Sequence, residues 1–225
     1  MNSLDIRAFR STALGALVMA ALLFVPAGTL DYWQAWLFMA VFAGASSAIG
    51  MYLALADPKL LERRMKAGPA AEKETTQKII MSFAMAGFIA LLLLPAFDHR
   101  FGWSKVPAYL ALAGDVLVGL GFFLTFLVLR ENSYGASTVQ VIEGQKVIST
   151  GPYAIVRHPM YAGALVMLLG IPLALGSWWG LCALLFIVPV LIWRLLDEER
   201  LLRKELPGYV EYTQEVRYRL VPCLW

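Results

Sequence analysis

The stretch YAGALVMLLGIPLALGSWWGLCALLFIVPVLIW, residues 161–193, decides the fold of this protein. It is apolar almost throughout, and it is too long for one membrane crossing, which takes about 20 apolar residues. Gly176 and Ser177 divide the stretch near its middle, and both residue types are typical of turns. The stretch therefore predicts a helical hairpin with two short arms.

Four more apolar stretches of membrane length precede this hairpin. They run from Leu14 to Leu30, Trp33 to Ala56, Ile79 to Phe97, and Val106 to Leu129. We therefore expect an all-α integral membrane protein with five to six transmembrane helices, including the C-terminal hairpin. Residues 1–130 would form a four-helix transmembrane region. Residues 131–225 would form a second region that comprises a polar loop, the hairpin and a tail.

Composition supports a membrane protein. Apolar residues make up 60% of the chain and charged residues 16%, against about 45–50% and 25% in an average soluble domain. The mean hydropathy is +0.66. A chain of 225 residues has too little interior to bury so much apolar surface in water. A soluble enzyme, a disordered protein and a nucleic-acid-binding module are therefore excluded.

Rare residues exclude further classes of site. The chain has two histidines, too few for a di-iron oxygenase, and zinc is not expected because structural zinc sites use three or four nitrogen or sulfur ligands. Cys182 and Cys223 have no motif spacing and are expected to be free thiols. The sequence also lacks a P-loop and a dinucleotide-binding glycine motif.

The positions of the basic residues predict the topology. Of the 19 Lys and Arg residues, only Arg100 and Lys105 lie on one side of the expected spans. Basic residues concentrate on the cytoplasmic side of membrane proteins. The N-terminus, the loop after the fourth span and the tail are therefore expected in the cytoplasm, which favours six crossings. The first span follows Arg7 and Arg10 as a secretory signal would, but Val25-Pro26-Ala27 is a weak cleavage site, so we expect it to be retained.

The polar residues concentrate in two segments that flank the hairpin, 130–161 and 194–225. Glu143-Gly144 predicts a hairpin or tight turn. Pro159 is suited to the first turn of a helix, which places His158 at the cap and Tyr161 in the first turn. Such a helix start favours an anion.

The second polar segment brings charged residues close to this helix start, so that the two segments together form the mouth of a possible site. Arg194 and Glu198 are four residues apart and share one helix face. A zwitterionic or cationic ligand would fit a mouth that offers both charges. Arg194 and Glu198 could instead form an interfacial ion pair, and Arg157-His158 could anchor the helix at the membrane surface. Asp115, a carboxylate inside a span, is a functional candidate by default, although it could simply bond to a neighbouring helix.

Two strings carry a family resemblance: STGPYAIVRHPMYAG, residues 149–163, and DEERLLRKELPGYVEY, residues 197–212. They resemble the isoprenylcysteine carboxyl methyltransferase family, which is related to phospholipid N-methyltransferases. The likeness covers about Gln140 to Trp225, and the compact chain is similar to bacterial members. It implies a membrane-embedded methyltransferase that uses S-adenosyl-L-methionine (SAM) without a Rossmann domain. Residues 131–225 would then be the catalytic region, with a cofactor loop, the helical hairpin and a cytoplasmic tail.

The resemblance also implies the roles of single residues. Arg194 matches an arginine that faces the methyl acceptor and is the candidate catalytic residue. The spacing from Gln140 to Tyr153 is shorter than in eukaryotic members, which makes Gln140 the less secure match. The positions that match cofactor-binding residues are Gln140, Gln145, Lys146, Val147, Ile148, Tyr153, His158, Tyr161 and Glu198.

The expected acceptor is a lipophilic molecule that offers a carboxylate, thiol, amine or lipid headgroup, and membrane lipids are the expected surroundings. The expected location is a bacterial inner membrane, with the site on the cytoplasmic side. Two alternatives stay open. One is an NADPH-binding membrane protein similar to sterol reductases, and the other is a non-enzymatic scaffold or transporter.

Overall fold

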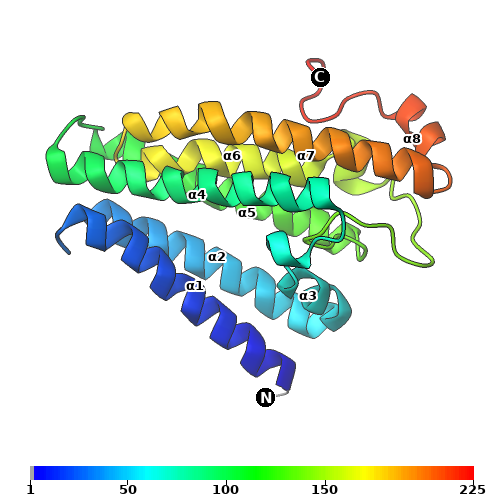
Figure 1. The fold of residues 1–225 in the computed structure, drawn as a ribbon, viewed down its shortest axis with the longest axis horizontal. Coiled ribbons are helices and arrows are strands. Elements are labelled where there is room, and N and C mark those ends of the chain that lie inside the picture. Colours follow the sequence, from blue (N-terminus) through cyan, green and yellow to red (C-terminus); the bar gives the residue numbers. More distant parts are fainter. Residues whose placement is uncertain (1–2) are drawn as a thin grey trace.

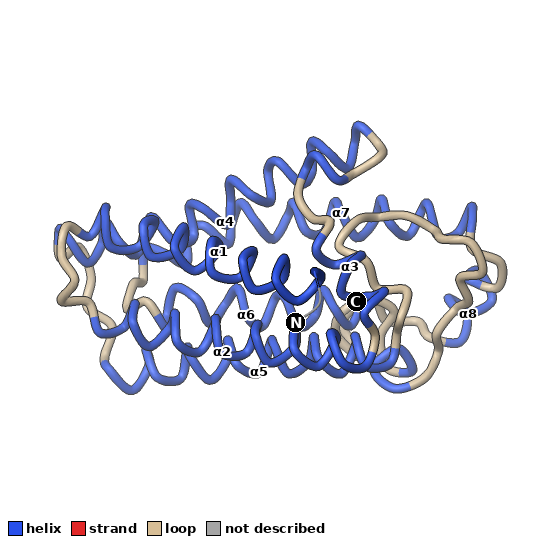
Figure 2. Tube along the Cα trace, turned by 90° about the horizontal axis from the view of Figure 1, so that it is seen from below, coloured by secondary structure: helices blue, strands red, loops and turns tan. Residues whose placement is uncertain are grey.

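The computed structural model describes residues 3–225, which are helical and contain no strand (Figures 1 and 2). Short 3₁₀ turns occur at Pro69–Ala71, Gly151–Ala154 and Trp179–Ala183. The α-helices are α1 (Ser3–Ala27), α2 (Trp33–Ala56), α3 (Pro58–Met65), α4 (Thr75–Phe101), α5 (Ala108–Glu131), α6 (Pro159–Ala174), α7 (Leu184–Glu205) and α8 (Tyr209–Glu215).

Within residues 3–225, five helical segments are long and apolar enough to cross a membrane. They lie in α1, α2, α4, α5 and the continuous stretch Trp179–Glu205. The sixth apolar helix, α6, spans only about 24 Å at 1.5 Å per residue. The prediction of an all-α membrane protein with five to six spans is therefore confirmed. Helices α1 and α4 begin earlier than expected, at Ser3 and Thr75, because each continues as polar turns beyond its apolar part.

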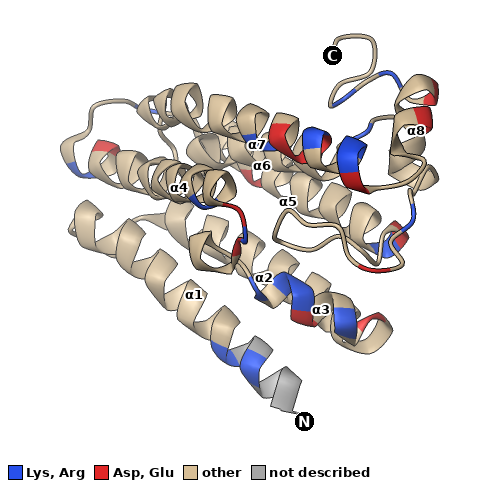
Figure 3. Cartoon of the chain, turned by 45° about the vertical axis from the view of Figure 1, so that its right-hand side comes forward, with Lys and Arg blue, Asp and Glu red and all other residues tan. Residues whose placement is uncertain are grey.

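The expected hairpin is formed by α6 and α7, and its turn lies at the predicted residues. The expectation of two short arms is wrong for the second arm, because α7 continues to Glu205 and is of membrane length together with the turn before it. Gly176 has a φ of 73°, which favours glycine. The Ser177 hydroxyl donates a hydrogen bond to Asp98 at the end of α4 and accepts one from the Gly180 N–H, 2.9 Å away. The tip of the hairpin is thus fixed to the connection between α4 and α5, at the end of the bundle opposite the basic loops (Figure 3).

Helices α5 and α6 are antiparallel and pack with their backbones in contact. A Cβ atom added at Gly114 of α5 would lie 2.2 Å from the backbone nitrogen of Ala174, and one added at Gly170 of α6 would lie 2.7 Å from the Gly114 carbonyl oxygen. Seven residues further along α5, a Cβ added at Gly121 would lie 2.7 Å from the Gly163 carbonyl oxygen of α6. Only glycine permits this approach. The pairing places the end of α5 beside the start of α6.

Lys and Arg gather at the end of the bundle where α1, α4 and α6 begin and α2, α5 and α7 end (Figure 3). Helix α1 packs against the bundle through its second half, where Leu23 and Phe24 are buried, and diverges from it toward its start (Figure 1). Arg100 and Lys105 lie at the opposite end. The fold therefore gives the asymmetry expected from the sequence. Cys182 and Cys223 form no disulfide.

The glycine contact gives a first prediction. Gly114→Ala should destabilise the protein by about 2 kcal/mol, because the neighbour that must move is backbone rather than a flexible side chain. The measurement is thermal unfolding of the purified protein in detergent. Gly119→Ala on the same helix is the control, since a Cβ there meets nothing within 4 Å. Equal stability of both variants would contradict the close α5–α6 contact.

Candidate functional site

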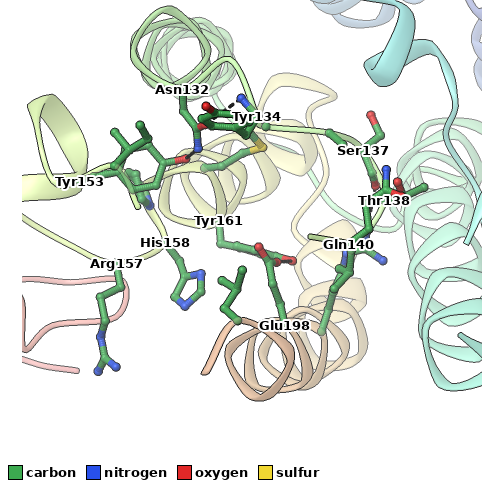
Figure 4. A pocket seen from close by; sticks show the side chains of 18 of the residues that line it. Asn132, Tyr134, Ser137, Thr138, Gln140, Tyr153, Arg157, His158, Tyr161 and Glu198 are labelled. Atoms are coloured by element: carbon green, nitrogen blue, oxygen red, sulfur yellow. Dashed lines mark hydrogen bonds between the residues drawn. The ribbon is translucent and has the colours of Figure 1, made fainter. Parts of the chain in front are cut away.

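A cavity of about 540 Å³ lies at the basic end of the bundle (Figure 4). Because the end of α5 lies beside the start of α6, the long segment 132–158 that joins them must fold over this end. It supplies one wall, while the first turn of α6 and the last turns of α7 supply others. The volume falls in the range of small-molecule sites, which is roughly 300–1,000 Å³.

All ten residues singled out in the sequence line this one cavity. They come from segments that are far apart in the chain, so their convergence is a result of the fold. Their roles in binding or catalysis stay predictions. The ten are Gln140, Gln145, Lys146, Val147, Ile148, Tyr153, His158, Tyr161, Arg194 and Glu198.

Tyr161 and Glu198 join the two arms of the hairpin at the centre of the cavity. The Tyr161 hydroxyl donates a hydrogen bond of 2.6 Å to the Glu198 carboxylate, and Figure 4 shows the two side chains meeting there. Pro159 begins α6 and His158 lies at its N-cap position, as the sequence predicts. The expected convergence of Tyr161 and Glu198 is therefore confirmed as geometry.

Arg194 is held by partners that the sequence did not indicate. It is buried, and its guanidinium lies 2.8 Å from the Glu72 carboxylate and 3.0 Å from the Gln77 side-chain oxygen. It also donates to the Ser137 carbonyl oxygen at 2.9 Å. The alternative of an ion pair between Arg194 and Glu198 is therefore wrong, because the carboxylate that pairs with Arg194 is that of Glu72. Glu72 and Gln77 reach Arg194 because the loop before α4 and the first turn of α4 both pack against α7.

Glu199 is a second charged centre that sequence reasoning missed. Its carboxylate lies 2.6 Å from the Arg157 guanidinium, 3.5 Å from His158 Nε2 and 2.9 Å from Arg219 Nε, and it is buried. Glu198 and Glu199 point about 100° apart on α7. One acid therefore faces the cavity, and the other ties α7 to the segment before α6 and to the tail.

The tail packs directly against Arg157 and His158. Their backbone N–H groups donate to the carbonyl oxygens of Tyr218 and Arg219, both at 2.9 Å. The Arg157 side chain also donates to the Arg217 carbonyl oxygen at 3.0 Å. These bonds fix the backbone that carries His158. The Arg157 side chain is thus bound by Glu199 and by the tail. Figure 4 shows it directed away from Tyr161 and Glu198.

Tyr153 is held from two sides. Its hydroxyl accepts a hydrogen bond of 2.8 Å from the Asn132 amide, and its carbonyl oxygen accepts one of 2.7 Å from the Tyr212 hydroxyl. Burial raises the pKa of Tyr153 to about 12. Burial likewise raises the pKa of Tyr209 and Tyr212. These phenols stay protonated at neutral pH. The Tyr212 hydroxyl donates to Tyr153, whereas the buried Tyr209 hydroxyl has no hydrogen-bond partner among residues 3–225.

The segment 140–148 forms a tight turn at Glu143-Gly144 without strand pairing. The Gln145 N–H donates to the Ile142 carbonyl oxygen at 3.0 Å, and the Gln145 side-chain oxygen accepts from the Ile142 N–H at 3.1 Å. Gly144 has a φ of 74°, which the turn requires. The expected turn is confirmed, and part of the Gln145 amide is engaged in holding it.

The cavity has an apolar arm that extends between the helices. By helix rise, Phe122 lies about 13 Å before the end of α5, so the arm reaches well into the membrane-spanning part. Asp115 does not line the cavity. It is buried, and neither carboxylate oxygen has a hydrogen-bond partner among residues 3–225. The residues of the arm come from α4 to α7: Met81, Ala84, Phe122, Thr125, Ala164, Met167 and Leu191.

Comparison with known proteins points to membrane enzymes. Residues 110–207 match the phospholipid methyltransferase family (PEMT), and this match covers α5, α6, α7 and the segment over the cavity. A mouse (Mus musculus) protein, Delta(14)-sterol reductase TM7SF2, is 30% identical over 94 residues. That alignment covers 40% of this chain and 22% of the reductase.

The charge pair at Arg194 gives the second prediction. Glu72→Gln should lower the free energy of unfolding by about 3 kcal/mol, because it leaves a buried guanidinium without its counter-charge. The measurement is denaturant or thermal unfolding in detergent. Glu74→Gln, at an exposed position two residues on, should change stability by less than about 0.5 kcal/mol. A Glu72→Gln protein as stable as Glu74→Gln would rule out the buried pair.

Residues 110–207 are therefore similar to the phospholipid methyltransferase family. The cavity that this segment helps to enclose joins a polar mouth to an apolar arm, in a chain with several membrane-length helices.

Proposed function

We propose that this protein is a membrane-embedded methyltransferase that uses SAM and methylates a lipophilic acceptor, as an isoprenylcysteine carboxyl methyltransferase-like enzyme of a bacterial inner membrane. The observation that carries the proposal is the shape of the cavity. A polar mouth lined by His158, Tyr161 and Glu198 continues into an apolar arm between α4 and α7. The family match over residues 110–207 supports the transferase chemistry.

The polar mouth fits a cofactor that carries several charges. Glu198 has a hydrogen bond from Tyr161 and no cation within ion-pair distance among residues 3–225, so it can accept an ammonium group or ribose hydroxyls. His158 Nε2 is buried and has no well-formed hydrogen bond in that part of the chain. Glu198, His158 and the polar residues around them would hold the methionine and nucleoside parts of SAM. When bound, SAM supplies an electrophilic methyl group on a sulfur that leaves readily.

The protein's own contribution is positioning and exclusion of water. Tyr161 orients Glu198, and Tyr209 and Tyr212 close the mouth with protonated phenols. The arm would hold the lipophilic part of the acceptor beside the mouth. Arg194 lies where mouth and arm meet, and its bonds to Glu72, Gln77 and Ser137 fix its position. We propose that it orients the reacting group of the acceptor.

One test measures the binding of SAM. Purified protein should bind SAM, and Glu198→Gln should weaken that binding at least about tenfold through loss of a charged hydrogen bond. Isothermal titration in detergent measures both. Glu205→Gln, at an exposed position on the same helix, is the control and should bind as the wild type does. Equal affinity in Glu198→Gln and wild type would reject the assignment of Glu198.

A second candidate function is an NADPH-dependent reduction, which the partial match to a sterol reductase favours. Of the three arginines that line the cavity, Arg157 and Arg194 are paired with carboxylates and so offer little to a 2′-phosphate, which leaves Arg64 as the arginine that such a phosphate could contact. Titration with NADPH decides the matter. Binding of NADPH without binding of SAM would replace the methyltransferase proposal.

The proposed cytoplasmic position of the site can be tested with a native thiol. Cys223 is exposed in the tail that packs against Arg157 and His158. In sealed right-side-out vesicles of Cys182→Ser protein, an impermeant maleimide should label Cys223 only after permeabilisation. Labelling of intact vesicles would place the cavity on the other face of the membrane.

A further inference from the structure

The charges around the cavity are unevenly compensated. Arg157 lies 2.6 Å from the Glu199 carboxylate, and Arg194 lies 2.8 Å from the Glu72 carboxylate. Both arginines are therefore neutralised by the protein itself. Lys146 is exposed to solvent. The charged side chains that line the cavity are Arg64, Lys146, Arg157, Arg194 and Glu198.

Arg64 differs from the other arginines of the cavity. It lies on α3, is half-buried, and donates to the Gly135 carbonyl oxygen at 3.3 Å and to the Met160 sulfur at 3.5 Å. No carboxylate in the described part of the chain lies within ion-pair distance of its guanidinium. Burial lowers the pKa of Arg64, so its charge is costly where it stands. A bound anion would relieve that cost.

The start of α6 adds a second source of positive potential at the same place. Met160, which the Arg64 guanidinium contacts, lies in the first turn of α6. His158 at the N-cap position makes no side-chain hydrogen bond to that turn. The first backbone N–H groups of a helix and its dipole together favour an anion. Arg64 therefore contacts a side chain in the first turn of a helix whose N-cap residue makes no side-chain hydrogen bond to that turn.

We propose that Arg64 and the start of α6 bind the carboxylate of the methionine part of SAM. This assignment rests on the proposed function. It complements Glu198, the uncompensated acid of the cavity, so the protein offers one cation and one anion to a cofactor that carries a carboxylate and an ammonium group. Arg64 contacts Gly135 and Met160 at the polar mouth, whereas the apolar arm is built from α4 to α7. This position favours the cofactor over the acceptor.

The experiment compares two ligands that differ by the carboxylate alone. Full-length protein in detergent is titrated with SAM and with decarboxylated SAM. Arg64→Gln should weaken binding of SAM by about 10- to 100-fold, the usual effect of losing a charge-assisted hydrogen bond. It should change binding of the decarboxylated ligand by less than about threefold. That selective loss identifies the carboxylate as the partner of Arg64.

Arg63 provides a matched control. It is the neighbouring residue of α3 and donates to the Ser133 carbonyl oxygen at 2.6 Å, so it ties α3 to the same loop. It does not line the cavity. Arg63→Gln should bind both ligands as the wild type does. Where Arg64→Gln fails to fold, Arg64→Lys keeps the charge and should still bind SAM more tightly than the decarboxylated ligand.

The possible results separate the two proposals. Equal weakening of both ligands in Arg64→Gln would show a structural role, and unchanged affinity for SAM would show no contact; either result overturns the assignment. An effect on the KM of the acceptor with unchanged SAM affinity would also overturn it, since the anion would then belong to the acceptor. Failure of the wild type to bind either ligand would reject the methyltransferase itself.

Discussion

The contact between the backbones of α5 and α6 is the constraint on which the rest of the structure depends. Glycines seven residues apart on each helix, Gly114 and Gly121 against Gly170 and Gly163, let two antiparallel helices touch along their length. In a membrane, where lipid is as apolar as the side chains, such close packing is a main source of helix association. It places the end of α5 beside the start of α6, and the segment between them must fold over the end of the bundle.

Buried charge then shapes what that end can bind. Arg194 and Arg157 lie in poorly solvated positions, where an unpaired charge costs several kcal/mol. The protein supplies Glu72 and Glu199 as their partners, and each partner comes from another element of the fold. These pairs hold the loop before α4, the segment before α6 and the tail against α7. Among the buried and half-buried charges that line the cavity, Arg64 and Glu198 have no such partner within residues 3–225, so they are the charges that its interior presents to a ligand.

Much of this arrangement follows from the sequence, and the part that does not has a physical reason. Apolar length predicts the spans, Gly176-Ser177 predicts the turn of the hairpin, and Pro159 predicts the start of α6. Local rules also bring Tyr161 and Glu198 to one mouth. Glu72 and Gln77 could not be found in this way, because their contact with Arg194 depends on how a loop packs against a helix more than 100 residues later. Glu199 was missed for a different reason: the sequence pattern pointed to its neighbour Glu198, and the ion pairs of Glu199 depend on the segment before α6 and on the tail.

The match to the phospholipid methyltransferase family begins at residue 110 and ends at 207, so it includes the hairpin but not α3, α4 or the tail. A sterol reductase shares similarity over a segment of comparable length. In this chain, Arg64 lines the cavity from outside the matched segment, and Met81 and Ala84 line its apolar arm. Glu72 and Gln77, also outside that segment, hold Arg194 in place. The part of the chain before the matched segment is thus more than a membrane anchor, because it adds both a charged side chain and apolar side chains to the lining of the cavity.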